Sequence, residues 1–295
     1  MISFERLVVF IFLISFLSCQ KPVNKHQKIG NIKIENNILN CEKVFYFDKI
    51  NKIEDHFFYG EILKMNFDEL EGFKQKEGLI YPGLKLLVLN KNKDTMLFNN
   101  DLYKDEIDGF DATSFELTPQ ITLANPIKSK SKYKVYTHLW DKIGDGNFKT
   151  ETKISVVPNN EIKIKNTSLK YKEVYLYSDK RDKVILNKKT FLNENIYFII
   201  EGLEGFTLKD GNAAPGASIT VTDSSGNKIF ENPDLFKDSE KYSLSDIKER
   251  FSPYITFNEK ENGNIKIRCR IKVWDKNNKN KSLILSTNLL LVDDN

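Results

Sequence analysis

Long apolar runs, cysteine, histidine and tryptophan are all scarce in this chain of 295 residues. The apolar run over residues 7–17 is shorter than the ~20 residues that a membrane-spanning helix needs. The three histidines, His26, His56 and His138, lack the spacing of zinc ligands. There is no GxSxG motif, and no cysteine has the sequence context of a nucleophile. We therefore predict that the protein is not an enzyme, with a hydrolase as the least favoured alternative.

A strong excess of one charge is also missing. The chain has 45 lysines and arginines against 41 aspartates and glutamates, which gives a formal net charge of +4. Such a balance predicts a mixed, solvated surface and not a nucleic-acid-binding protein.

The N-terminal segment has the order of parts found in a secretory signal peptide. A polar start with Glu5 and Arg6 is followed by the apolar run, and a small residue then precedes a cysteine. The motif Phe16-Leu17-Ser18-Cys19 resembles the lipobox of bacterial lipoproteins, in which the cysteine is lipidated and becomes the new N-terminus. The resemblance implies a signal peptide over residues 1–18, a lipid such as palmitate on Cys19, and a membrane-anchored protein.

Residues 20–31, QKPVNKHQKIGN, are polar and basic, without apolar periodicity. We predict a flexible tether over residues 19–30. In lipoproteins of this type an aspartate after the cysteine tends to retain the protein at the inner membrane, so Gln20 implies the outer membrane. Lysines stand where surface-exported lipoproteins carry acidic residues, which favours the periplasmic face. A cell-surface location is the alternative.

The rest of the sequence contains an internal repeat. Six blocks recur in the same order, 130 to 134 residues further along the chain. LEGF at 70–73 returns at 203–206, and LWDK at 139–142 returns as VWDK at 273–276. We predict a tandem duplication with domain 1 over residues 31–158 and domain 2 over residues 159–295.

Each copy reads as β-structure. Short runs rich in β-branched and aromatic residues, such as 85–90 and 218–223, are bounded by turn signals. The prediction is an all-β protein with two tandem antiparallel β-sandwiches. Segments 102–110 and 235–251 are expected to form short helices or long loops. The repeated Pro-Gly pairs are expected to precede strands and to turn the chain.

Alternation along residues 133–141 assigns one face to the core and places Tyr136, His138 and Trp140 on the other. In the second copy Trp274 persists at the position of Trp140, while a lysine replaces His138. We expect these tryptophans to cover a sheet edge or the domain junction. Carbohydrate stacking on an indole is the functional alternative, which makes Trp140, Trp274 and His138 weak candidates for ligand binding.

The loop DKIGDGN offers Asp141 and Asp145, and this arrangement resembles the calcium-binding loops at the tips of C2-type sandwiches. The second copy, DKNNKNK, retains one acid, so a hairpin turn is the simpler account. No cofactor is predicted apart from the lipid, with calcium as a weak alternative. Cys41 and Cys269 are expected to be separate buried thiols, with a disulfide as the alternative.

Together these features predict an envelope lipoprotein that works by binding. We expect a non-catalytic adaptor or accessory subunit of an envelope or secretion assembly, anchored by its lipid and holding another envelope protein. The alternative is a glycan- or calcium-binding module at the cell surface.

Overall fold

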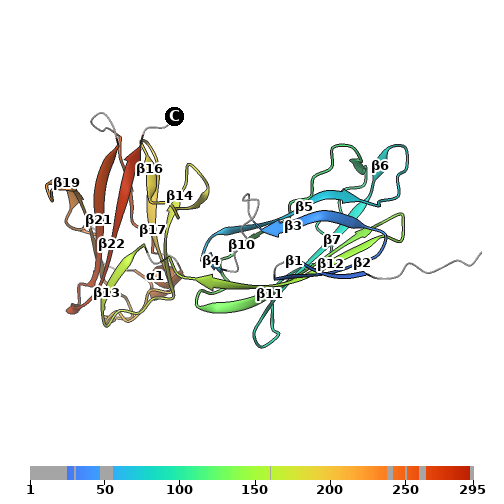
Figure 1. The fold of residues 1–295 in the computed structure, drawn as a ribbon. Coiled ribbons are helices and arrows are strands. Elements are labelled where there is room, and N and C mark those ends of the chain that lie inside the picture. The colour runs from blue at the N-terminus through green and yellow to red at the C-terminus, as the bar shows by residue number, and fades with distance from the viewer. Residues whose placement is uncertain are drawn as a thin grey trace, which may run out of the picture.

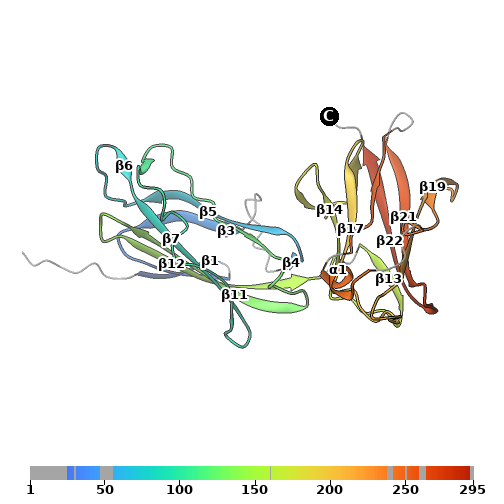
Figure 2. The same cartoon turned by 180° about the vertical axis from the view of Figure 1, so that it is seen from behind.

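The computed structural model describes residues 25–29, 31–46, 56–159, 161–237, 242–249, 251–258 and 264–292. Within these ranges the chain forms two antiparallel β-sandwiches in series, as predicted (Figures 1 and 2). None of the described helices has the length and apolar character needed to cross a membrane. The predicted signal peptide and Cys19 lie outside the described residues.

Domain 1 has a larger and a smaller sheet. The spatial order in the larger sheet is β1 (Lys25–Ile29), β2 (Ile32–Asn36), β12 (Asn147–Val157), β11 (Ser131–Asp141), β7 (Pro82–Asn90) and β8 (Thr95–Asn99), with β4 (His56–Phe58) also paired to β12. The smaller sheet has the order β10 (Gln120–Thr122), β5 (Ile62–Glu71) and β3 (Asn40–Tyr46). A separate ribbon consists of β6 (Leu79–Ile80) and β9 (Phe110–Asp111).

Domain 2 repeats this plan. Its larger sheet has the order β13 (Lys163–Thr167), β22 (Asn278–Val292), β21 (Ile265–Asp275), β18 (Pro215–Asp223) and β19 (Lys228–Asn232), with β16 (Lys189–Phe191) also paired to β22. The smaller sheet has the order β15 (Lys183–Val184), β14 (Glu173–Ser178), β17 (Asn195–Glu201) and β20 (Tyr254–Thr256). A short helix, α1 (Leu244–Glu249), precedes β20.

The principal strands of the two domains match one for one. β2, β12, β11, β7 and β8 correspond to β13, β22, β21, β18 and β19, and both β4 and β16 pair in parallel with the last long strand of their domain. Alternate residues of the long strands point into each core, where a fully buried large apolar side chain contributes about 1.5–3 kcal/mol. The core of domain 1 includes Ile34, Leu63, Leu84, Val135 and Phe148, and that of domain 2 includes Leu176, Phe198, Ile219, Ile271 and Leu285.

Two expectations from the sequence are corrected. The predicted tether contains a strand, because Lys25–Ile29 form β1 and pair with β2. A strand at a sheet edge needs no apolar face, and edge strands are often rich in lysine, so hydropathy gave no sign of it. The Pro-Gly pairs do not precede their strands: Pro82 begins β7 and Pro215 begins β18.

Segments 102–110 and 235–251, which were predicted to be either short helices or long loops, differ in structure between the two copies. Residues 244–249 form α1 in domain 2, with Ile247 in the core. The corresponding part of domain 1 contains turns and the two-residue strand β9.

The chain enters domain 1 at the end opposite to domain 2. Lys25 pairs with Asn36, and Asn36 pairs with Phe148 near the start of β12. β12 then runs to Val157, after which the chain continues into domain 2 (Figure 1). Val157 lies nine residues after Phe148 on β12, which corresponds to ~30 Å.

Candidate functional site

The predicted ligand-binding tryptophans have a structural role common to both copies. A Cβ added to Gly83 would overlap the indole of Trp140, and the same holds for Gly216 and Trp274. Each glycine lies opposite its tryptophan on the neighbouring strand. β11 and β21 are interior strands, so the tryptophans cover glycine backbone on an outer sheet face and not a sheet edge or the domain junction. The repeated Pro-Gly pair therefore supplies a glycine for indole packing.

The aspartates that follow the two tryptophans also make the same kind of hydrogen bonds in both domains. The two carboxylate oxygens of Asp141 accept hydrogen bonds from the backbone N–H groups of Lys74, at 2.7 Å, and Ile143, at 3.0 Å. Those of Asp275 accept hydrogen bonds from the backbone N–H groups of Thr207, at 2.6 Å, and Asn277, at 2.9 Å. A role present in both copies is one that the fold needs.

An ion pair between two repeated blocks is also common to both domains. It joins DLY at 101–103 to LWDK in domain 1, and DLF at 234–236 to VWDK in domain 2. The ammonium of Lys142 lies 3.0 Å from the carboxylate of Asp101, and that of Lys276 lies 3.0 Å from the carboxylate of Asp234. Each aspartate also accepts a backbone N–H from the strand that begins with its Pro-Gly pair, at Leu84 and Ala217. Three of the repeated blocks thus meet in one polar cluster in each domain.

Four predicted site residues do meet at one place. His138, Trp140, Asp141 and Asp145 all line a surface depression of about 480 Å³. The His138 and Trp140 rings lie 5.3 Å apart, and His138 Nε2 is 2.7 Å from Asn147 Oδ1. In domain 2 the ammonium of Lys272 lies over the Trp274 ring, 5.6 Å from its centroid. An indole and an imidazole thus line the depression in domain 1, whereas a lysine lies over the corresponding indole of domain 2.

Metal and thiol chemistry find little support in the described part of the chain. No group of three or more histidine, cysteine, aspartate or glutamate side chains there is arranged to hold a metal ion. Cys41 and Cys269 are free and buried, in agreement with the expectation of separate thiols. Burial raises the pKa of each thiol to about 12, so neither forms the thiolate that a nucleophile requires.

A domain-specific polar site lies at the junction between the sandwiches. Tyr59 of domain 1 is buried, and its hydroxyl donates to Glu201 Oε2 of domain 2 at 2.7 Å. The same hydroxyl accepts the backbone N–H of Asn125 at 3.0 Å. Tyr175 of domain 2 donates to the other oxygen, Glu201 Oε1, at 2.9 Å, and its ring lies 5.5 Å from that of Tyr59. One carboxylate therefore bridges a tyrosine from each domain.

A second carboxylate completes the junction. Glu173 lies opposite Glu201 across β14 and β17, and its Oε1 accepts the backbone N–H of Ser129 of domain 1 at 2.8 Å. Burial, with a smaller contribution from the charge of Glu201, raises the pKa of Glu173. Two carboxylates directly opposite in a sheet repel each other. The hydrogen bonds from domain 1 give each of them a donor.

The charges of the two paired residues at this place differ between the copies, and the difference is visible in the sequence. In domain 1 the pair in the register of Glu173 and Glu201 is Lys43 opposite Asp68. A cross-strand pair of opposite charges has thus become a pair of like charges in domain 2. Sequence reasoning missed this site, although a comparison of the two copies for changes of charge sign would have marked Glu173.

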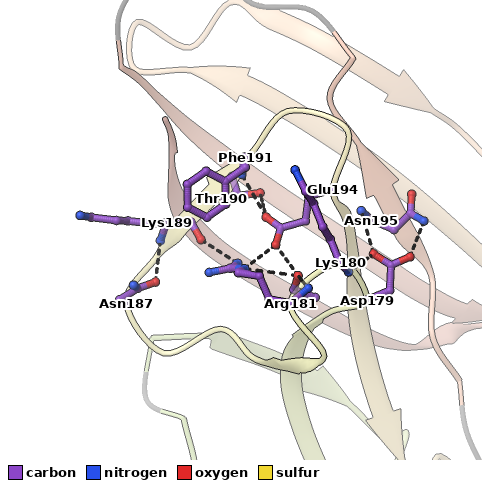
Figure 3. Close-up of polar contacts among 10 residues, drawn as sticks. Asp179, Lys180, Arg181, Asn187, Lys189, Thr190, Phe191, Glu194 and Asn195 are labelled. Carbon is purple, nitrogen blue, oxygen red and sulfur yellow. Dashed lines mark hydrogen bonds and ion pairs between the residues drawn. The ribbon is translucent and has the colours of Figure 1, made fainter. Parts of the chain in front are cut away.

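A buried polar network in domain 2 holds the loop that contacts domain 1 (Figure 3). The carboxylate of Glu194 is fully buried and lies 2.5 Å from Arg181 Nε. It also accepts hydrogen bonds from the Ser178 hydroxyl, from the Thr190 hydroxyl at 2.8 Å and from the Phe191 backbone N–H at 3.0 Å. Burial alone would raise the pKa of Glu194, but these donors outweigh it and hold the pKa below the ordinary value.

Arg181 extends this network along the loop. Its Nη2 donates to the Lys189 carbonyl at 3.1 Å, and its guanidinium lies 5.1 Å from the centre of the Phe191 ring (Figure 3). The loop between them carries Val184, which packs so closely on domain 1 that a Cβ added to Gly60 would overlap it. The network therefore holds a second segment of domain 2 that contacts domain 1, in addition to β14 and β17.

Comparisons with known proteins give no family. No protein-family model matches the chain, and no curated protein matches it. Among the solved structures, 44 chains match. One of them, named pT26-6p, is 7% identical, with a TM-score of 0.24, and the match covers 93% of this chain and 66% of that one. The chain thus spans slightly less than two thirds of that structure, and a TM-score this low supports no inference about function.

Proposed function

We propose that the protein is a lipid-anchored envelope lipoprotein that acts by binding, as a non-catalytic adaptor for a second envelope protein. A lipid on Cys19 supplies the anchor at the outer membrane, on its periplasmic face. Domain 1 is the spacer, and domain 2 presents the binding surface.

The observation that supports this proposal is the bridge from Tyr59 through Glu201 to Tyr175. It joins the sandwiches with directional hydrogen bonds between groups that are largely removed from water, which favours one relative orientation. The chain enters domain 1 at the far end, with Lys25 opposite Asn36. A lipid attached upstream would therefore hold domain 2 at a set distance, at least the ~30 Å length of β12.

The test is a crosslinking pull-down of full-length tagged protein from its native envelope. We expect a stoichiometric envelope protein with the wild type, and less of it with Tyr59→Phe, which breaks the bridge. Cys19→Ala is the anchoring control and should release the protein from membranes. No specific partner would count against the adaptor, and equal capture by Tyr59→Phe would show that partner binding does not depend on the bridge. Membrane retention of Cys19→Ala would count against the lipoprotein.

A glycan-binding module is the second candidate, and the depression at Trp140 favours it. An exposed part of an indole beside an imidazole is a surface on which a sugar ring stacks. Melting temperature measured with neutral oligosaccharides, and separately with calcium, tests both versions of this candidate. A ligand-dependent rise that Trp140→Ala abolishes and Trp274→Ala retains would support it. No rise with any ligand would dismiss it.

A further inference from the structure

The outer face of β21 has a straight row of cations. Lys266, Arg268, Arg270 and Lys272 occupy alternate positions of the strand, and all four are exposed. Side chains two residues apart on a strand share a face, so the row extends over ~20 Å. Regular spacing along one line distinguishes this surface from scattered lysines.

The strands on both sides keep the row free of acid. The residues opposite these cations are Leu290, Asn288, Ser286 and Ile284 on β22 and Thr222, Thr220 and Ser218 on β18. Three more lysines lie on the same face, Lys163 and Lys165 on β13 and Lys189 on β16. In the described strands of this sheet the one acid on that face is Glu231 of β19, which is already paired with Lys228.

In domain 1 the acids on the same face are paired with lysines. There Glu151 lies 3.5 Å from Lys33 and 3.3 Å from Lys134, and Glu35 lies 3.2 Å from Lys149. In the matching register domain 2 has Ser286 in place of Glu151 and Lys165 in place of Glu35.

The central strand β21 also carries more positive charge on this face than its counterpart β11. Arg270 replaces Tyr136, and Lys272 replaces His138. Domain 2 has therefore lost both of these acids, and Lys165, Arg270 and Lys272 are cations at positions where domain 1 has none. In turn, the domain 1 lysines Lys85, Lys149 and Lys153 are replaced by Ser218, Ile284 and Asn288. The fold does not require the change, because domain 1 has the same fold without it.

One end of the row is hollowed. A depression of about 700 Å³ is lined by Lys188, Lys189, Lys266 and Arg268, together with hydroxyl and amide side chains that include Thr222, Ser225 and Asn288. Arg268 Nε is held by Asn288 Oδ1 at 3.4 Å. Asp223 also lines the depression, but both its oxygens accept hydrogen bonds from Asn227, each at 2.8 Å. Guanidinium, ammonium and hydroxyl groups together suit carboxylate oxygens and sugar hydroxyls.

The remaining chemistry of the face selects among anionic partners. Single-stranded nucleic acid is bound on exposed aromatic platforms, but Trp274 packs on Gly216 and lies under Lys272. A protein interface is centred on buried aromatic or aliphatic anchors and is poor in lysine, whereas this face is hydroxyl-rich and lysine-rich. A linear, hydroxylated polymer with regularly spaced negative charges fits both the row and its flanks.

We propose that the outer face of the domain 2 sheet, centred on Arg268 and Arg270, binds a linear acidic polysaccharide. The row of cations pairs with successive carboxylates along the polymer, and the serine, threonine and asparagine side chains of β18 and β22 hydrogen-bond to its hydroxyls. This activity is separate from the adaptor function and does not depend on it.

The test measures binding of the full-length protein to polygalacturonate, which has one carboxylate per sugar, with dextran as the neutral polymer. We expect binding to polygalacturonate that weakens with added salt, and none to dextran. Arg268→Gln/Arg270→Gln should weaken binding at least about tenfold, since two charge-assisted contacts are lost. Lys132→Gln/Lys134→Gln removes two cations from the matching positions of domain 1 and should leave the affinity unchanged.

A gain of acid provides a second variant that is expected to fold. Lys165→Glu/Ser286→Glu restores the two acids that domain 1 carries at the matching positions, and it should weaken binding like the double arginine variant. Equal losses in the domain 1 and domain 2 variants would overturn the proposal. Binding to polyglutamate or to phosphatidylglycerol vesicles but not to polygalacturonate would also overturn it, in favour of an acidic protein or a membrane.

Discussion

The indole of Trp274 fills the space next to Gly216 on the neighbouring strand, so that even a methyl group on this glycine would overlap it. We expect Gly216→Ala to displace the indole and to lower the free energy of unfolding by about 1–3 kcal/mol, the usual cost of overpacking. Denaturant unfolding followed by tryptophan fluorescence measures both effects. Ser218→Ala, two residues along the same strand face, is the control and should stay within about 0.5 kcal/mol. Unchanged stability and emission would refute this reading.

Glu194→Gln tests the buried network in domain 2. The change leaves the Arg181 guanidinium without its buried anion, and we expect the free energy of unfolding at neutral pH to fall by about 3 kcal/mol. Glu161→Gln breaks an exposed pair with Lys188 and should cost less than about 1 kcal/mol. Equal effects of the two substitutions would show that the buried network contributes no more to stability than an exposed ion pair.

The pH dependence of the Glu194→Gln effect has a defined sign. The pKa of Glu194 is lowered in the native state because its hydrogen bonds outweigh the effect of burial. Its ionisation therefore stabilises the fold above the unfolded pKa of about 4.3, and this stabilisation is lost as the pH falls through the native pKa. The difference between wild type and variant should be largest at neutral pH and should shrink below about pH 4. A difference that grows on acidification would contradict the assignment.

Tyr59→Phe tests the bridge at the junction. It removes the donor to Glu201 and leaves the Asn125 backbone N–H without its acceptor, at a cost of about 1–3 kcal/mol. We expect a broader distribution of distances between spin labels on the two domains. Tyr254→Phe, which removes an exposed hydroxyl in domain 2, is the control. An unchanged distribution would mean that packing alone fixes the domains.

Glu173→Gln tests the raised pKa at the same junction. A carboxyl group whose native pKa lies above its unfolded value stabilises the fold at low pH, and this contribution is lost as the pH rises through the native pKa. The glutamine retains an oxygen that can accept the Ser129 N–H. We therefore expect the variant to be at least as stable as the wild type at pH 7 and to lose less stability between pH 4 and pH 7. Parallel pH profiles would argue against a buried, perturbed Glu173.

The fold was predictable because the same strand pattern occurs in both halves of the sequence. Six repeated blocks and strict alternation along strands such as 133–141 were enough for two sandwiches. The structural roles of individual blocks were harder to predict, because Gly216 and Trp274 are far apart in the sequence and meet only through strand pairing. Strand β1 escaped prediction because an edge strand satisfies its backbone without an apolar face.

The domain junction was missed for a different reason. Tyr59 and Glu201 belong to different copies, so no pattern within one repeat brings them together. What the sequence did contain was the replacement of Lys43 by Glu173 in matching register. Residues that differ between copies of one fold, rather than residues that agree, marked both the junction and the cationic face.

Strand β1 also decides how domain 1 would respond to mechanical load. Lys25 lies at the end of the sheet away from domain 2, and β1, β2 and β12 are adjacent strands. A force that pulls Lys25 and domain 2 apart acts along these strands, so the ladder between β1 and β2 is loaded in shear. Its hydrogen bonds must break together instead of one after another. Single-molecule extension of the full chain should therefore register a distinct rupture before domain 1 unfolds.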